Sequence, residues 1–326
     1  MKKYMRARER RKRLYSIILI PRVLKIRRYL KKYIRKEEGN VSVIVLTEHI
    51  GDIIACEPVS YWLKRTYQHK VVWLINEKYH ELLLMFRNVD EIIDLSCLSE
   101  WVYLDKFTHL PHVYNLHFDG RQCSRFYLSN QSSQKHIGFE NYYNYGCLLE
   151  SFCMVGKLPR LNIRPQLFLV QHTLSFNYLL PDKYIVVHPQ ANDISRNWDI
   201  GKWNQLISSF PDFTFIEIGL SPVLSGKNCI TSLCGKLTFQ DIALVVKNCF
   251  LFIGIDSGMA HFANALGTPS LILLGKYGNF DKYMPYSGIF DIEDFRVIQY
   301  PDFVYDLPVS IVKEEADRFI SALNAR

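Results

Sequence analysis

The sequence predicts an α/β protein with two Rossmann-like halves. Short β-branched runs alternate with segments of helical periodicity, and the alternation starts again after a proline-rich stretch. With 326 residues, the chain is long enough for two domains that each bury a core. An apolar content of 48% is typical of a globular protein.

Residues 1–38 form a basic arm that differs from the rest of the chain. The arm contains 16 Lys/Arg and 3 Asp/Glu, whereas the remaining residues contain 24 and 29. The net charge of +8 therefore originates in the arm, and the body is slightly acidic. A body of this charge argues against nucleic acid as a partner.

The apolar residues of the arm predict an amphipathic helix. Its apolar run, residues 14–20, is too short to cross a membrane, which takes about 20 residues. No small-residue cleavage site of a signal peptide follows this run. After Pro21, cations occupy one helical face, and the other face carries Val23, Ile26, Leu30, Tyr33 and Ile34. Two interpretations remain open: a peripheral anchor on an anionic membrane and a solvated, partly disordered arm.

The first half, residues 39–165, begins with a continuous β-branched run at 41–46. Such a run is typical of a central parallel strand, and a helical stretch follows it as far as Tyr67. A second helical stretch is expected at 78–86. Further strands are expected at 71–75, 91–95, 113–118 and 135–139.

Three prolines in residues 159–182 predict the junction between the halves. The second half, residues 183–300, has expected strands at 184–188, 213–218, 229–233, 250–255 and 270–275. One intervening helix carries Trp203 and Phe210 on its apolar face, and another starts with a capping-box pair, Thr238 and Asp241. A helical segment is expected at 301–326.

No cofactor and no metal are predicted. Neither half has a G-x-G-x-x-G motif after its first strand, which argues against a dinucleotide. None of the eight cysteines forms a C-x-x-C pair, so a zinc ribbon is not indicated. Buried free thiols in a reducing cytosol are the better interpretation.

Residues 252–275 predict a strand that ends at an anion-binding helix. The strand ends in Asp256, and apolar positions from Met259 onward follow helical spacing until Gly267 and Pro269. The first-turn N–H groups lie at the carboxyl edge of a parallel sheet, where open α/β sheets bind ligands. In the alternative interpretation, Ser257 is only an N-cap and His261 is a packed or surface histidine.

Two other loops are expected at strand ends. The loop after 184–188 holds one cation, Arg196, which suits a pyrophosphate near a helix N-terminus, although a simple surface charge is the alternative. The loop after 41–46 holds His49, Gly51 and Asp52. The Asp52 carboxylate suits a general base that takes a proton from a hydroxyl, or an N-cap.

These segments together resemble glycosyltransferase family 9, the lipopolysaccharide heptosyltransferases and their relatives. The resemblance is carried by IGDIIACEP (50–58), HPQANDISRNWDIGKWNQLI (188–207) and a third motif at 234–275 that contains GIDSGMAHFANALGTPSLILLG. It implies a GT-B fold, in which two Rossmann-like domains face a cleft. It further implies an inverting, metal-independent transfer from a nucleoside-diphosphate sugar.

The resemblance also implies roles for individual residues. Asp52 would be the general base, and Arg196 would bind the donor diphosphate together with the backbone N–H groups of Ser257, Gly258 and Met259. Asp256 and His261 would support this site, and Gln190 and Ala191 lie in the loop that approaches the phosphates. The chain departs from many relatives at Leu46 and Lys276, where they carry a basic residue and a proline.

The implied partners are an ADP-heptose-like donor and a lipid-linked glycan acceptor, such as lipopolysaccharide. Arg121 and Arg125 are candidate contacts to an anionic acceptor, or two solvated arginines. The implied location is the cytoplasm, peripherally on the inner face of the inner membrane. A catalytically silent sugar-nucleotide-binding partner protein with the same fold is the alternative function.

Overall fold

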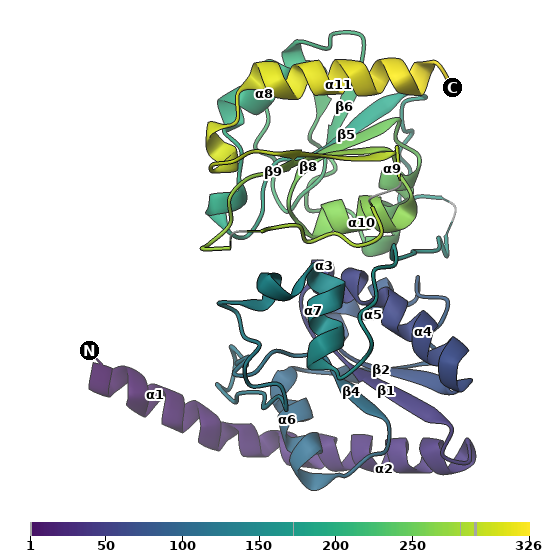
Figure 1. Cartoon of the computed structure of the whole chain (residues 1–326), viewed down its shortest axis with the longest axis vertical. Coiled ribbons are helices and arrows are strands. Elements are labelled where there is room, and N and C mark those ends of the chain that lie inside the picture. The colour runs from purple at the N-terminus through teal and green to yellow at the C-terminus, as the bar shows by residue number, and fades with distance from the viewer. Residues whose placement is uncertain (1, 172, 281, 290–291) are drawn as a thin grey trace. The chain divides into compact units, whose positions relative to one another are not determined.

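The computed structural model describes residues 2–171, 173–280, 282–289 and 292–326 (Figure 1). The chain forms two compact units, Met1–Ile163 and Arg164–Arg326, which we call the N-terminal and C-terminal units. The boundary between Ile163 and Arg164 lies inside the proline-rich stretch of the sequence.

The N-terminal unit contains a parallel sheet with the strand order β3-β2-β1-β4. The strands are β1 (Val41–Val45), β2 (Lys70–Asn76), β3 (Glu91–Leu95) and β4 (Val113–Asn115). All five residues of β1 are buried, as expected for a central strand covered on both faces. The helices that follow along the chain are α3 (Ile50–Ala55), α4 (Glu57–Tyr67), α5 (His80–Leu83), α6 (Leu98–Phe107) and α7 (Leu148–Val155).

The basic arm is helical and belongs to the N-terminal unit. It consists of α1 (Lys2–Tyr15), a short 3₁₀ turn, η1 (Ser16–Leu19), and α2 (Ile20–Lys36). The predicted helix after Pro21 is therefore present, but its apolar face does not point to solvent. Val23 and Leu30 are fully buried against β1 residues such as Val43. The expectation that this face contacts a membrane is wrong, because it covers the unit's own sheet.

The C-terminal unit contains a second parallel sheet with the order β10-β9-β8-β5-β6-β7. The strands are β5 (Tyr184–His188), β6 (Thr214–Glu217), β7 (Cys229–Ile230), β8 (Leu251–Ile255), β9 (Ser270–Leu274) and β10 (Phe295–Gln299). The helices are α8 (Ile200–Ser208), α9 (Phe239–Lys247), α10 (Gly258–Leu266) and α11 (Val309–Asn324). Trp198, Trp203 and Phe319 are buried in the core of this unit.

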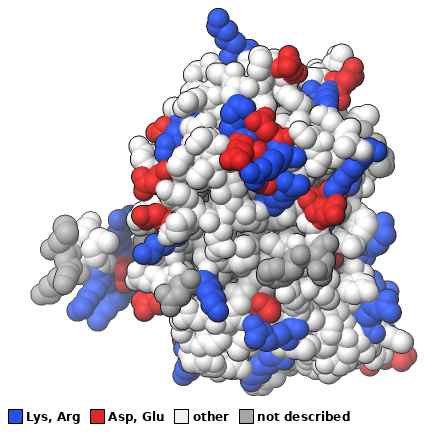
Figure 2. All heavy atoms as spheres, turned by 45° about the horizontal axis from the view of Figure 1, so that its top comes forward, with Lys and Arg blue, Asp and Glu red and all other residues white. Residues whose placement is uncertain are grey.

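Charged side chains of both signs are interspersed over the face of the C-terminal unit shown in Figure 2. On α11, for example, Lys313 pairs with Asp317 at 2.6 Å, and Arg318 pairs with Glu314. That face of the unit therefore carries no patch of uniformly positive or uniformly negative charge.

The structure corrects three expectations for individual elements. Residues 135–139 form turns rather than a strand, because the Asn141 side chain accepts from the Gly138 N–H at 2.8 Å and donates to the His136 carbonyl at 2.8 Å. The helix expected at 78–86 is reduced to a 3₁₀ turn, η2 (Glu77–Tyr79), and the four-residue α5. Of the strand expected at 229–233, only β7 (Cys229–Ile230) forms.

No helix in the described ranges combines the length and the apolar content needed to cross a bilayer.

Candidate functional site

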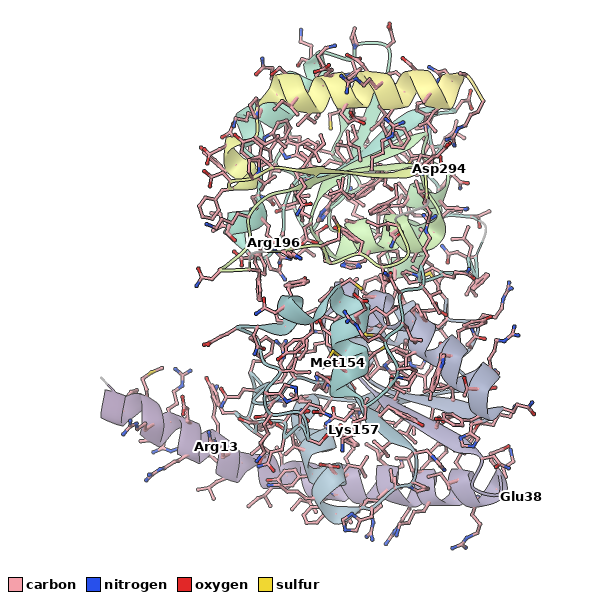
Figure 3. The ribbon with its side chains drawn as sticks, in the orientation of Figure 1. Arg13, Glu38, Met154, Lys157, Arg196 and Asp294 are labelled. Atoms are coloured by element: carbon pink, nitrogen blue, oxygen red, sulfur yellow. The ribbon has the colours of Figure 1, made fainter. Side chains whose placement is uncertain are left out.

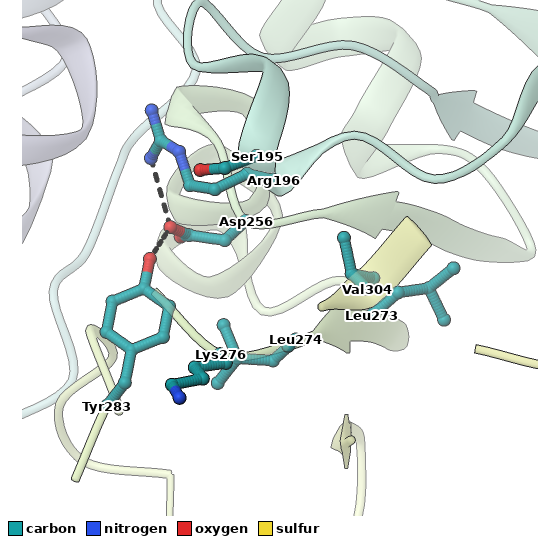
Figure 4. A pocket seen from close by; sticks show the side chains of 9 residues that line it. Ser195, Arg196, Asp256, Leu273, Leu274, Lys276, Tyr283 and Val304 are labelled. Carbon is teal, nitrogen blue, oxygen red and sulfur yellow. Dashed lines mark hydrogen bonds and ion pairs between the residues drawn. The ribbon is translucent and has the colours of Figure 1, made fainter. Parts of the chain in front are cut away.

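Arg196 and Asp256 meet at the carboxyl edge of the C-terminal sheet. Asp256 directly follows β8, and Arg196 lies in the 3₁₀ turn η4 (Ile194–Arg196) that follows β5. Since β5 and β8 are paired parallel neighbours, the segments after them emerge side by side. The Arg196 Nη1 donates to Asp256 Oδ2 at 3.0 Å (Figure 4).

Asp256 is a buried carboxylate surrounded by donors. Its side chain is 5% exposed, and besides Arg196 it accepts a hydrogen bond from each of two tyrosines. The Tyr286 hydroxyl lies 3.0 Å from Oδ1. The Tyr283 hydroxyl donates to Oδ2, as Figure 4 shows. Burial and the adjacent Asp256 charge raise the pKa of both phenols, so both remain donors at neutral pH.

Arg196 is a cation, and the Nε side of its guanidinium makes no hydrogen bond to the described residues. Burial lowers the pKa of Arg196, but the Asp256 carboxylate together with Tyr283 and Tyr277 outweighs burial, and the pKa is raised. The guanidinium also lies over the Tyr277 ring, with 5.3 Å between Cζ and the ring centroid. Its Nε is buried and has no acceptor among the residues that the structure describes.

The helix predicted after Ser257 is confirmed as α10. Ser257 is its N-cap, because the Oγ accepts from the Ala260 N–H at 3.4 Å, and Gly267 ends it in the left-handed region at φ 69°. The same Oγ lies 3.0 Å from His188 Nδ1 at the end of β5. The Ser257 backbone N–H interacts with the Tyr286 hydroxyl. The first-turn N–H groups of Gly258 and Met259 have no acceptor within the helix.

Two histidines pack beneath this helix start. His188 and His261 are 9% and 3% exposed, and the His261 ring centroid lies 4.8 Å from that of Tyr286. Burial lowers the pKa of each to about 4. Both imidazoles are therefore neutral at pH 7, and His261 is packed against the site rather than exposed in it.

A small pocket opens beside the Arg196–Asp256 pair. Its empty space of about 180 Å³ is partly open solvent, and it is lined by Ser195, Arg196, Asp256, Leu273, Leu274, Gly275, Lys276, Tyr283 and Val304. A Cβ at Gly275 would lie 2.2 Å from the Val304 backbone nitrogen, so only glycine permits this close approach of the chain. Ala191 lies in the neighbouring loop, where its N–H donates to Asn197 Oδ1 at 2.7 Å. Gln190 is exposed in the same loop.

In the N-terminal unit, Asp52 lies in the first turn of α3, after β1. Its carboxylate accepts from the His49 backbone N–H at 3.3 Å, which stabilises the helix start. Arg121 follows the neighbouring strand β4, and its Nη2 lies 2.5 Å from His49 Nε2 and 3.3 Å from Glu48 Oε2. The structure therefore brings Arg121 into the same cluster as Asp52. Arg125 is exposed over the Phe126 ring and takes no part in this set of contacts.

Two histidines of this cluster have lowered pKa values. Burial is the main cause for His49, with a smaller contribution from Arg121 that the carboxylates of Asp52 and Glu48 oppose. His117 is buried, and burial lowers its pKa to about 3. Its Nε2 accepts from the Thr47 N–H at 3.1 Å, which fixes the loop after β1.

Sequence reasoning missed Tyr283, Tyr286, His188 and His117. His188 is the last residue of the predicted strand at 184–188, so its place at the sheet edge was available as a signal. The tyrosines lie in an irregular segment that carries no periodic pattern, and only the fold shows that they contact Asp256. In the described residues, no group of three or more His, Cys, Asp or Glu is arranged to hold a metal ion.

The structure contains two Rossmann-like units. In the C-terminal unit, a small pocket lined by Arg196 lies at the carboxyl edge of the sheet. Residues 158–287 match the family model described as glycosyltransferase family 9 (heptosyltransferase). This match lies mostly in the C-terminal unit and supports the resemblance of the chain to glycosyltransferase family 9.

Curated relatives match over a limited stretch. Lipopolysaccharide heptosyltransferase 3 from Escherichia coli is 30% identical over 105 residues, which is 28% of this chain and 31% of that protein. The same-named protein of strain K12 is 29% identical over 107 residues, 29% of this chain and 31% of that protein. The chain thus matches about a third of the length of these relatives.

Solved structures share the fold along most of both chains. A family 9 glycosyltransferase from Veillonella parvula has a TM-score of 0.62 at 16% identity, covering 86% of this chain and 97% of the other. The E. coli ADP-heptose lipopolysaccharide heptosyltransferase II has a TM-score of 0.63 at 17% identity, covering 86% and 99%. These likenesses confirm the α/β, GT-B fold class.

Proposed function

We propose that this chain is a glycosyltransferase that moves a sugar, heptose or a similar one, from a nucleoside-diphosphate donor to a lipopolysaccharide or other surface-glycan acceptor. The observation that carries the proposal is the Arg196 guanidinium at the end of β5, whose buried Nε has no acceptor among the described residues. The match of residues 158–287 to the family model supports the donor class, and so does the likeness to heptosyltransferase II, which is described as an ADP-heptose enzyme.

The donor diphosphate would bind beside Arg196 and the start of α10. Asp256 holds one edge of the guanidinium through Nη1 and leaves the Nε edge for a phosphate oxygen. The N–H groups of Gly258 and Met259 add the positive end of a helix dipole. The pocket does not enclose the donor, because its empty space of about 180 Å³ includes open solvent; we assign to it only the approach of the diphosphate to Arg196.

Departure of the nucleoside diphosphate builds negative charge on its terminal phosphate. Arg196 and the α10 N-terminus are fixed before the reaction, so they can stabilise this charge without reorganising. Protein groups would then provide the positive charge that a divalent cation provides in other transferases. This supports a metal-independent transfer, in which Asp256 positions Arg196 and does not touch the sugar.

Asp52 would act as the general base toward the acceptor. The acceptor hydroxyl transfers its proton to the Asp52 carboxylate as its oxygen forms a bond to the anomeric carbon, and the bond from that carbon to the donor phosphate breaks. Attack opposite to the leaving phosphate inverts the anomeric configuration. Arg121, in the same cluster, suits an anionic group on the acceptor. A lipid-linked glycan acceptor would place the reaction at a membrane surface.

The experiment is a thermal-shift screen of ADP, UDP and GDP against the matching monophosphates and sugar nucleotides. A ligand at 100 times its dissociation constant stabilises the folded state by about 2.7 kcal/mol, so the preferred base should be visible. We expect diphosphates to stabilise more than monophosphates, and product formation from the preferred sugar nucleotide and a lipid-linked glycan. Equal stabilisation by mono- and diphosphates would count against the assignment of Arg196, and absence of any nucleotide effect would count against the function.

A further inference from the structure

The helical arm has a second apolar stripe on the side opposite to its buried one. The buried stripe faces the sheet and comprises Ser16, Leu19, Val23, Ile26 and Leu30. On the outward side, Leu14, Ile17 and Ile18 follow the spacing i, i+3, i+4 and are 67%, 54% and 66% exposed. These three side chains bury little of their surface within the fold. A cluster of exposed aliphatic side chains indicates a surface that interacts with another molecule or with a membrane.

Exposed cations flank this outward apolar stripe on both sides. At 100° per residue, Arg10 and Arg11 precede it and Lys25, Arg28 and Lys32 follow it on the same half of the helix surface. Within the described residues, no carboxylate forms an ion pair with any of these five. The arm spans roughly 50 Å at 1.5 Å per residue, so it presents a long cationic face with an apolar centre.

The arm is fixed to the N-terminal unit, so the outward face has a defined orientation. The Arg13 Nε donates to the Tyr127 carbonyl at 3.1 Å, and Ser16 Oγ lies 2.6 Å from the Tyr103 hydroxyl. Further along, the Arg22 Nε pairs with the buried Glu100 of α6 at 3.1 Å. Figure 3 shows the helical arm running from Arg13 to Glu38 along one side of this unit.

We propose that the outward face of α1, η1 and α2 docks on an anionic phospholipid bilayer. The helix would lie in the plane of the surface, with Leu14, Ile17 and Ile18 at the boundary between headgroups and acyl chains and the flanking cations on lipid phosphates. A nucleic acid would use the cations but leave the aliphatic centre exposed, so a bilayer fits better. The role of this docking, presenting the enzyme to a lipid-linked acceptor, rests on the proposed function, whereas the binding itself does not.

The test uses the full chain and cosedimentation with phosphatidylcholine vesicles, with and without phosphatidylglycerol. We expect binding only with phosphatidylglycerol and release at high salt, because exposed charges are screened. The Leu14→Ser/Ile17→Ser/Ile18→Ser variant should bind at least tenfold more weakly. As a matched control, Leu179→Ser/Leu220→Ser removes two side chains of the C-terminal unit that are 94% and 90% exposed, and it should bind like the wild type.

A charge variant tests the second half of the proposal. Lys25→Gln/Arg28→Gln/Lys32→Gln should lower the vesicle partition coefficient by roughly fivefold for each cation lost. The proposal is overturned if both arm variants sediment with the vesicles like the wild type, or if single-stranded RNA binds this face more tightly and displaces the vesicles. Nucleotide thermal shifts on the same variants should match the wild type, so failed docking is distinguishable from a failed donor site.

Discussion

The guanidinium of Arg121 lies 2.5 Å from the imidazole Nε2 of His49, the residue that begins the helix carrying Asp52. Two loops that follow neighbouring parallel strands are joined by this contact. Through this contact, the charge of Arg121 acts on His49 at the start of the helix that positions Asp52. Titration of His49 can therefore test the cluster.

Replacing Arg121 with alanine should raise the pKa of His49. Burial is the main reason that this pKa is low, and the adjacent cation lowers it further, so removing the cation makes the imidazolium less unfavourable. The shift is measured by NMR titration of the His49 ring protons. Arg125→Ala is the matched control, because Arg125 is exposed over Phe126 and should leave His49 unchanged. A His49 pKa that is the same in Arg121→Ala and the wild type would contradict the contact.

Asp52→Asn should retain nucleotide binding and lose turnover by roughly 10²-fold or more, the scale of a lost general base. Asparagine still offers an oxygen to the His49 N–H, so the start of α3 and the thermal stability should change little. The measurements are turnover with a saturating donor and the melting temperature of the same preparation. Turnover within twofold of the wild type would remove Asp52 from the reaction.

Arg196→Ala should weaken binding of a nucleoside diphosphate by about 1.5–3 kcal/mol, the worth of a charge-assisted hydrogen bond. Acceptor affinity should not change. Isothermal titration with the nucleotide measures this effect, and Arg318→Ala serves as the control because that side chain is 63% exposed on α11. Arg196→Lys should be intermediate, since an ammonium keeps the charge but loses the guanidinium fork. Undiminished nucleotide affinity in the alanine variant would rule out the assignment.

The stability of the protein should fall as the pH is lowered from about 6.5 to 4. His188 and His261 have folded pKa values of about 4, so in this range the unfolded state binds more protons than the folded state. Each contributes up to about 1.4 kcal/mol per pH unit. Urea denaturation at pH 7 and pH 5 measures the slope. His261→Gln should reduce it. An unchanged slope in His261→Gln would mean that this imidazole binds protons equally in the folded and unfolded states.

Much of the fold could be predicted from local pattern. The central strands β1, β5 and β8 are continuous apolar runs, because both faces are buried, and Ser257 and Gly267 carry the start and stop signals of α10. The segment at 135–139 departs from the predicted strand because hydrogen bonds of the Asn141 side chain determine its conformation, and no periodic pattern indicates such bonds.

The candidate site could be predicted where its residues follow strands directly. Asp256 and Arg196 do so, and parallel pairing brings them together. Tyr283 and Tyr286 approach Asp256 from a distant irregular segment, so only tertiary packing reveals them. The sequence also could not predict what the apolar face of α2 packs against. A helical pattern shows that a face is apolar, but it does not indicate whether protein or lipid covers that face.

The burial of the α2 stripe decides where the chain can be shortened. Leu19, Val23, Ile26 and Leu30 together contribute roughly 6–12 kcal/mol, at about 1.5–3 kcal/mol for each side chain removed from water. That is comparable to the roughly 5–15 kcal/mol that holds a typical domain folded. Deletion of residues 1–38 would strip one face of the N-terminal sheet and leave Glu100 buried without Arg22. The chain should tolerate a new N-terminus ahead of Ser16. From Ser16 onward the arm covers the sheet of the N-terminal unit, and removing it should destabilise that unit.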